Sequence, residues 1–355
     1  MIVTMPDTTT SALADEIDEL HVERGEAATG RVLTLVIITR SAHLEGALET
    51  VNTACREHPC RVIAIVTDQG DYPGPGEDED GNRAGGQDGG PGRPGQPDGG
   101  HGREDAPGDG CSCSKRTEHA GSHTLDAEIR SGSDAGAGEI VVLRPVPDLL
   151  RHSDALVIPL LVPDAPLVAW WPADIPEDVS ADRVGTMAVS RITDVMHAED
   201  PQAAFDRVLA HPSPQDVDLS WTRTTVWRSM LASMLDQPPH LPIRSVRVTG
   251  QAHYLPLELL ASWLAMKLGV PVQVERKEGA QAITGVFFER EDGTLGMERE
   301  RGDQAVISQP GQADQGVSLP LRTDVDCMNE ELGRLDPDEV YGEVITRGWP
   351  LVDHD

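Results

Sequence analysis

The sequence predicts an α/β protein with two α/β domains: an N-terminal domain with a largely parallel sheet and helices, and a C-terminal domain with a mixed or antiparallel sheet covered by helices. Residues 31–39 and 61–67 are continuous apolar runs rich in β-branched side chains, typical of strands buried on both faces. The amphipathic helix predicted at 42–57 between them completes a parallel crossover unit. After Pro242, strand-like runs alternate with turn residues, which favours hairpins.

The N-terminal domain is predicted to span residues 1–212. Its further expected helices are 11–21, 148–157, a stretch ending near 186, and 201–209; its further strands are 124–131, 139–144, 167–171 and a short segment at 191–194. Residues 69–122 interrupt this domain. Between Asp71 and Gly110 there is no Val, Ile, Leu, Met, Phe or Trp, so we expect a disordered acidic insertion rich in Gly and Pro.

The C-terminal domain is predicted to span residues 213–355 and to begin with, or be joined by, a helix at 218–236. Asp218 or Ser220 is the expected N-cap of that helix. The later predicted strands are 245–249, 270–275, 283–290, 295–300, 305–309 and 316–321, with helices at 255–268, 325–335 and 337–346. Gly269 is expected to close the first of these helices, and Asp336 to cap the last.

Composition excludes several classes of partner. The 355 residues are 38% hydrophobic and carry a formal charge of −31, which disfavours nucleic acid and anionic membranes as partners. No apolar run is long enough to span a bilayer, and the N-terminus lacks the features of a signal peptide. Five cysteines without a secreted-type framework suggest reduced thiols and a cytoplasmic protein.

Catalytic motifs are not recognisable in the sequence. It contains no Walker loop, dinucleotide fingerprint, HExxH or GxSxG, and its acidic runs lack the spacing of a calcium loop. We therefore expect a protein that is not an enzyme and that needs no cofactor.

Tryptophan and arginine residues are the candidates for partner binding. The candidates are Trp170, Trp171, Trp221, Thr222, Arg223, Trp227 and Arg228. Adjacent Trp170 and Trp171 should point to opposite faces of a strand, one into the core and one toward a cleft or partner. For Trp221 and Trp227 the alternative is packing in the core. For the two arginines the alternative is an internal ion pair.

The cysteines leave several interpretations open. Cys111, Cys113, His119 and His123 could hold a metal, form a reactive thiol pair, or lie in a loop without a role. Cys55 and Cys60 are either small buried hydrophobic residues or a redox-sensitive pair.

Several ungapped runs resemble one known family. They are EHPCRVI at 57–63, LDAEIRSGSDAGAGEIVVLR at 125–144, LLVPDAPLVAWWP at 160–172, DLSWTRTTVWR at 218–228 and LDPDEVY at 335–341. In this order they resemble the OpcA family, the glucose-6-phosphate dehydrogenase assembly proteins of actinobacteria and cyanobacteria.

The resemblance implies a non-enzymatic assembly factor or allosteric activator of glucose-6-phosphate dehydrogenase, the enzyme that opens the oxidative pentose phosphate pathway. It also raises the redox interpretation of Cys55 and Cys60, with thioredoxin as a further partner. Two alternatives stay open: a metabolite- or redox-sensing regulator of the dehydrogenase, and a sugar-phosphate enzyme in which Arg223 and Arg228 clamp phosphate.

Overall fold

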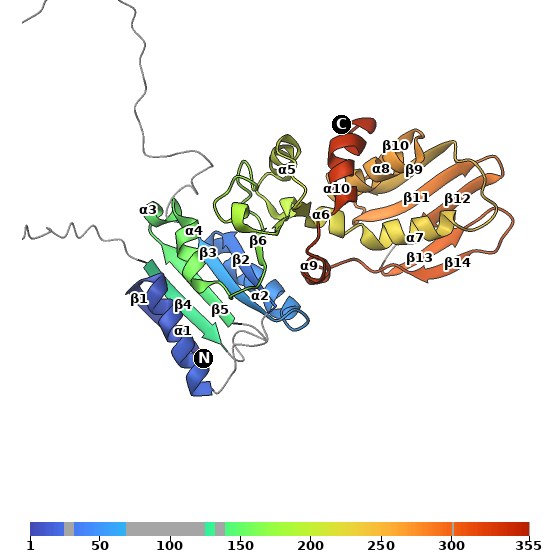
Figure 1. The fold of residues 1–355 in the computed structure, drawn as a ribbon. Helices are drawn as coiled ribbons and strands as arrows, with labels where there is room; N and C mark the ends of the chain where they lie inside the picture. The colour runs from blue at the N-terminus through green and yellow to red at the C-terminus, as the bar shows by residue number, and fades with distance from the viewer. Residues whose placement is uncertain (25–31, 69–124, 132–138, 300–301, 355) are drawn as a thin grey trace, which may run out of the picture. The chain divides into compact units, whose positions relative to one another are not determined.

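The computed structural model describes residues 1–24, 32–68, 125–131, 139–299 and 302–354 (Figure 1). The predicted insertion at 69–122, with the metal candidates Cys111, Cys113, His119 and His123, lies outside these residues. In the described part of the chain, no helix is both long and apolar enough to cross a membrane.

The first sheet combines a parallel centre with an antiparallel edge. Its described strands run in the order β1-β4-β5-β3-β2-β6-β7-β8, parallel from β5 to β8 and antiparallel at β1 and β4. The strands are β1 (Ile2–Thr8), β2 (Leu33–Thr39), β3 (Cys60–Val66), β4 (Leu125–Ser131), β5 (Glu139–Pro145), β6 (Leu167–Trp171), β7 (Ser190–Thr193) and β8 (Asp216–Asp218). The predicted largely parallel sheet is confirmed. Strand β1 was not predicted, because its mostly exposed residues lack a buried apolar run.

The helices associated with this sheet are α1 (Thr10–Arg24), α2 (Ser41–Ala54), α3 (Pro147–Leu150), α4 (Ser153–Val157) and α5 (Pro201–Ala210). Of these, α1 is longer than predicted, α5 agrees with the prediction, α2 is shorter, and the helix predicted at 148–157 is broken into α3 and α4. The helical stretch predicted to end near Thr186 is wrong: only the 3₁₀ turn η3 (Gly185–Met187) forms there. Asp178 and Asp182 bind nearby backbone N–H groups with their carboxylates, which favours turns over a continuous helix.

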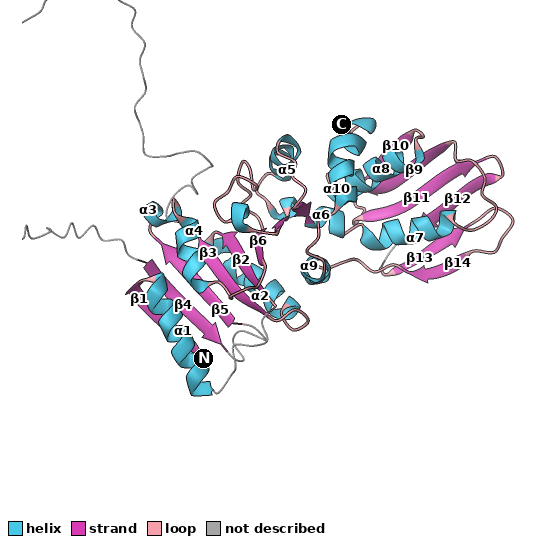
Figure 2. Cartoon of the chain, viewed as in Figure 1, coloured by secondary structure: helices cyan, strands magenta, loops and turns pink. Residues whose placement is uncertain are grey.

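The second sheet is mostly antiparallel, as predicted (Figure 2). Its described order is β10-β9-β11-β12-β13-β14, with only the β10–β9 pair parallel. The strands are β9 (Ser245–Gln251), β10 (Val272–Lys277), β11 (Ile283–Arg290), β12 (Gly293–Glu298), β13 (Gln304–Ser308) and β14 (Gln315–Ser318). Residues of helices α7 (Thr225–Leu235) and α8 (Leu255–Leu268) share its hydrophobic core, and Gly269 ends α8 in the left-handed conformation, as predicted.

The helix predicted at 218–236 is broken into two. Asp218 caps α6 (Leu219–Thr222) by accepting a hydrogen bond from the Ser220 amide at 2.8 Å, which confirms one of the two predicted caps. Thr224 follows α6, and its hydroxyl donates to the Trp221 carbonyl at 2.7 Å. Helix α7 starts at the next residue. The buried apolar residues of α6 belong to the core of the first sheet, and those of α7 belong to the core of the second sheet.

The last helices pack on the first core. Helix α9 (Asp324–Gly333) is capped by Thr323, and α10 (Glu339–Glu343) by Asp338, so the predicted cap Asp336 is wrong. Asp338 takes that role because its carboxylate accepts from the Tyr341 amide at 2.9 Å. The turns η5 (Val344–Gly348) and η6 (Trp349–Leu351) follow. Buried residues of these helices belong to the same hydrophobic core as β2, β3 and β6.

Candidate functional site

A pocket lies at the point where the connections of the parallel sheet change direction. From β2 the chain moves to β3 on one side, and β6 occupies the other side of β2. Open α/β sheets bind ligands outside the carboxyl ends of strands at such a switch point. The pocket, of about 270 Å³, is lined there by residues of α2, the end of β6, the turn after β7 and the first residue of α9.

Arg223 lies at the centre of a buried ion-pair network beside this pocket. Its guanidinium donates to both carboxylate oxygens of Asp194, at 3.0 and 2.9 Å, and to Asp324 Oδ1 at 2.6 Å. The Arg223 side chain is only 8% exposed and that of Asp194 1%. The network therefore joins the turn after β7 to helices α6 and α9 within the chain.

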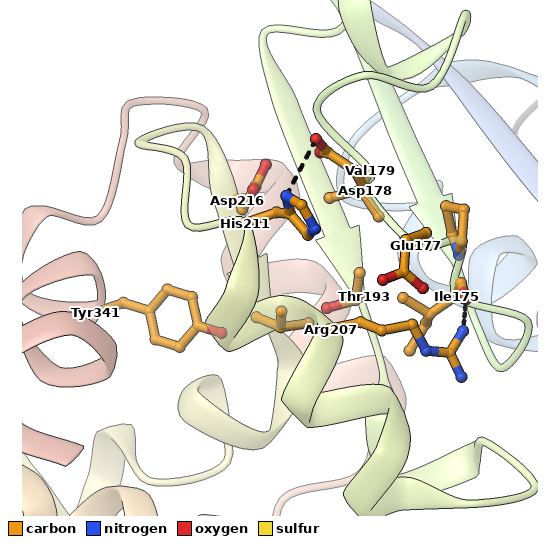
Figure 3. A pocket seen from close by; sticks show the side chains of 11 residues that line it. Ile175, Glu177, Asp178, Val179, Thr193, Arg207, His211, Asp216 and Tyr341 are labelled. Carbon is orange, nitrogen blue, oxygen red and sulfur yellow. Dashed lines mark hydrogen bonds and ion pairs between the residues drawn. The ribbon is translucent and has the colours of Figure 1, made fainter. Parts of the chain in front are cut away.

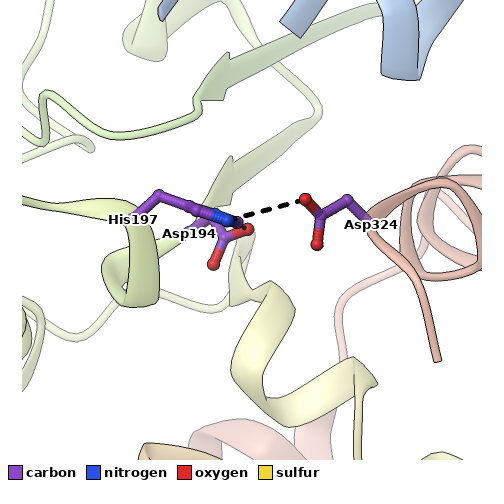
Figure 4. Close-up of side chains that lie close together, drawn as sticks. All are labelled: Asp194, His197 and Asp324. Atoms are coloured by element: carbon purple, nitrogen blue, oxygen red, sulfur yellow. Dashed lines mark hydrogen bonds and ion pairs between the residues drawn. The ribbon is translucent and has the colours of Figure 1, made fainter. Parts of the chain in front are cut away.

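His197 completes the network on the pocket side (Figure 4). Its Nδ1 lies 2.8 Å from Asp194 Oδ2, and its Nε2 lies 3.6 Å from Asp324 Oδ2. Burial alone would raise the pKa of Asp194. The hydrogen bond with His197 and the charge of Arg223 outweigh that effect and lower the pKa, so the carboxylate stays ionised.

A second cluster of predicted site residues is also internal. The Trp221 indole N–H donates to Asp338 Oδ2 at 2.9 Å, and the Arg228 guanidinium lies 3.7 Å from the Trp221 ring centroid. Thr222 donates its hydroxyl hydrogen bond to Glu331 at 2.6 Å. These contacts connect α6 and α7 to α9 and α10.

Most of the residues predicted to bind a partner lie inside the folded chain. Trp170, Trp171, Trp221, Thr222 and Trp227 are buried in the folded chain. Of the paired tryptophans, Trp171 packs in the core and Trp170 lines the pocket, which is the predicted arrangement of one ring in the core and one facing a cleft. Arg223 follows the alternative of an internal ion pair, and the half-buried Arg228 donates to the hydroxyls of Thr224 and Thr225.

Cys55 and Cys60 are joined by a disulfide, so the expectation of reduced thiols throughout is wrong for this pair. The end of α2 and the start of β3 bring their Cα atoms to 5.9 Å, within bridging distance. Both residues are buried, as the core interpretation predicts. Cys327 is the free cysteine among the described residues.

A smaller pocket lies near the start of β8 (Figure 3). Burial raises the pKa of Asp216 there to about 6, although Arg191 Nε donates to its carboxylate at 2.5 Å. The buried Tyr341 hydroxyl lines the same pocket and has no hydrogen-bond partner among the described residues. His211 and Asp178 form an ion pair of 3.6 Å at its edge.

Comparison with protein families assigns both halves of the chain. Residues 51–210 match the glucose-6-phosphate dehydrogenase subunit N-terminal domain, and residues 214–345 match the C-terminal domain of the same subunit. The chain belongs to the OpcA family. A search of curated proteins and a search of solved structures found no significant match.

The acidic and histidine side chains of the pocket were not predicted as site residues. Asp194 ends a predicted short strand and His197 follows it, and their three-residue spacing at the carboxyl end of the strand was the available signal. Asp324 lies far along the chain, and nothing in its local sequence indicates that it returns to this sheet. Arg223 was singled out, but for an external contact.

The buried Glu331 side chain should make the stability of the folded chain depend on pH. Burial raises its pKa to about 7, with Thr222 opposing and Glu330 and Asp338 adding to the increase. The protonated Glu331 carboxyl contributes stability that is fully present below pH 4.5, the ordinary pKa of a glutamate. This contribution, up to about 3 kcal/mol, is lost as pH rises through 7. In urea unfolding from pH 4.5 to 8, Glu331→Gln should lose less stability than the wild type. The exposed control Glu49→Gln should follow the wild type, and a parallel decline in Glu331→Gln would contradict the assignment.

Proposed function

We propose that the chain is a non-enzymatic assembly factor or activator subunit of glucose-6-phosphate dehydrogenase. The observation that carries the proposal is the match of both halves, in order, to the two domains described as a subunit of that enzyme. The sequence offers no nucleophile, metal-protease or phosphate-loop motif that would support a separate catalytic activity.

Because five of the seven predicted residues are buried, we propose that the partner surface consists mainly of other side chains. Arg223 and Trp221 act through internal contacts, so their proposed role is to hold α6, α7 and α9 in place behind that surface. The charge of −31 favours a protein partner over nucleic acid or an anionic membrane. We place the complex in the cytoplasm, where the dehydrogenase works.

The experiment measures NADP⁺ reduction by the purified glucose-6-phosphate dehydrogenase of the same organism, with and without the chain. We expect added chain to raise the activity or the oligomer size of the dehydrogenase, and the chain alone to show no dehydrogenase or lactonase turnover. Heat-unfolded chain at the same concentration is the control for unspecific protein effects. Turnover by the chain alone, or a dehydrogenase unchanged in activity and size, would contradict the proposal.

The redox-sensing alternative is favoured by the disulfide between Cys55 and Cys60. The same assay, run after oxidation and after reduction by thioredoxin, distinguishes a redox-sensing regulator from an assembly factor that does not respond to redox state. A redox-sensing regulator would change its effect on the dehydrogenase between the two conditions, and a variant carrying Cys55→Ser and Cys60→Ser would not.

A further inference from the structure

The geometry points to a divalent transition-metal site in the switch-point pocket, with His197, Asp324 and His43 as ligands. It goes beyond the proposed function and does not depend on it. His197 Nδ1 is held 2.8 Å from the buried carboxylate of Asp194. A carboxylate on one ring nitrogen fixes the tautomer and leaves the other nitrogen as a metal ligand, an arrangement that recurs around protein-bound zinc.

The second ligand faces that free nitrogen. Asp324 Oδ2 lies 3.6 Å from His197 Nε2, and ligand atoms of Asp194, His197 and Asp324 all lie within 4.8 Å of one another. Two ligand atoms bound to one tetrahedral zinc are roughly 3.4 Å apart. Arg223 occupies Oδ1 of Asp324 and leaves Oδ2 for an ion. One guanidinium beside two carboxylates leaves one negative charge, which a cation can offset.

The pocket has room for an ion with its water, and a second imidazole lines it. His43, whose side chain is 43% exposed, has its Nδ1 3.3 Å from Asp174 Oδ2, which repeats the carboxylate–imidazole pattern of His197. His43 lines the same pocket as His197 and Asp324, and its exposed imidazole is the third ligand that we propose. Imidazole with carboxylate suits zinc and its neighbours, whereas magnesium and calcium prefer oxygen ligands alone.

A separate observation indicates that the pocket takes a ligand. Trp170 lines it and is only 3% exposed, yet its indole N–H has no hydrogen-bond partner among the described residues. Buried donors are nearly always satisfied, and a water molecule held by the ion would supply the acceptor. Because Asp324 begins α9 and His197 follows β7, an ion here would add a link between these two elements.

The test is zinc binding to the full chain, measured by calorimetry under reducing conditions. The wild type is expected to bind one more Zn²⁺ per chain than His197→Gln or Asp324→Asn. We expect His43→Gln to weaken this binding at least about tenfold. His211→Gln, which removes an exposed histidine beside Asp178, is the matched control and should bind as the wild type does. Any zinc bound by cysteines or histidines elsewhere is common to all variants and cancels in the difference.

A second readout keeps the result independent of folding. His197 is 52% exposed, so its variant should remain folded and retain the wild-type circular dichroism. Bound Co²⁺ should give d–d absorption in the wild type and none in His197→Gln. Added Mg²⁺ should not displace the bound Co²⁺. Equal zinc binding by wild type and His197→Gln, or equal losses in His197→Gln and His211→Gln, overturns the site. Unchanged affinity in His43→Gln contradicts the three-ligand assignment.

Discussion

Arg223→Ala is expected to lower the free energy of unfolding by roughly 3–5 kcal/mol, because it leaves the buried Asp194 carboxylate without its guanidinium. The guanidinium makes two hydrogen bonds to Asp194 and one to Asp324, so the substitution removes three charged contacts at once. Urea unfolding followed by circular dichroism measures the change. The expected loss is large because Asp194 and Arg223 are almost fully removed from solvent.

The matched control is Arg347→Ala, in which a 72% exposed arginine loses a 3.4 Å pair with Glu343. An exposed pair contributes less than about 1 kcal/mol, so this variant should unfold nearly as the wild type does. The double variant Arg223→Ala, Asp194→Ala should cost less than the sum of its single changes, since it removes both members of the pair. An Arg223→Ala protein as stable as the wild type would show that the network contributes little.

Trp227→Ala is expected to cost about 3–5 kcal/mol, because it removes a nearly fully buried indole from the core of the second sheet. The ring packs from α7 into that core, and the Arg299 guanidinium lies 5.5 Å from its centroid. Ser229→Ala, at an exposed position of the same helix, should change stability by less than about 0.5 kcal/mol. Similar melting of the two variants would contradict the core assignment of Trp227.

The main strands were predictable because burial on both faces leaves a strong local pattern. Strands β2, β3 and β6 are apolar runs whose limits the sequence places within two residues. Strand β1 is exposed at the sheet edge and has no such pattern. The helix predicted near Thr186 failed because aspartate side chains capture the backbone amides locally, an effect that periodicity does not record.

The site was less predictable, because it depends on contacts between distant residues. The Trp and Arg residues that are dense in 221–228 make many contacts with distant parts of the chain. Whether Arg223 points inward or outward depends on Asp194 and Asp324, which lie 29 and 101 residues away in sequence. In an acidic chain a buried arginine is as well explained by an internal carboxylate as by a partner. The local sequence could not decide between these alternatives.

The central claim is that this chain binds glucose-6-phosphate dehydrogenase, and sedimentation velocity of the two purified proteins tests it most directly. We expect a sedimentation boundary that contains both proteins and moves faster than either protein alone, at matched concentrations and moderate salt. Two boundaries at the positions of the separate proteins, over a range of concentrations that covers their cellular levels, would contradict it.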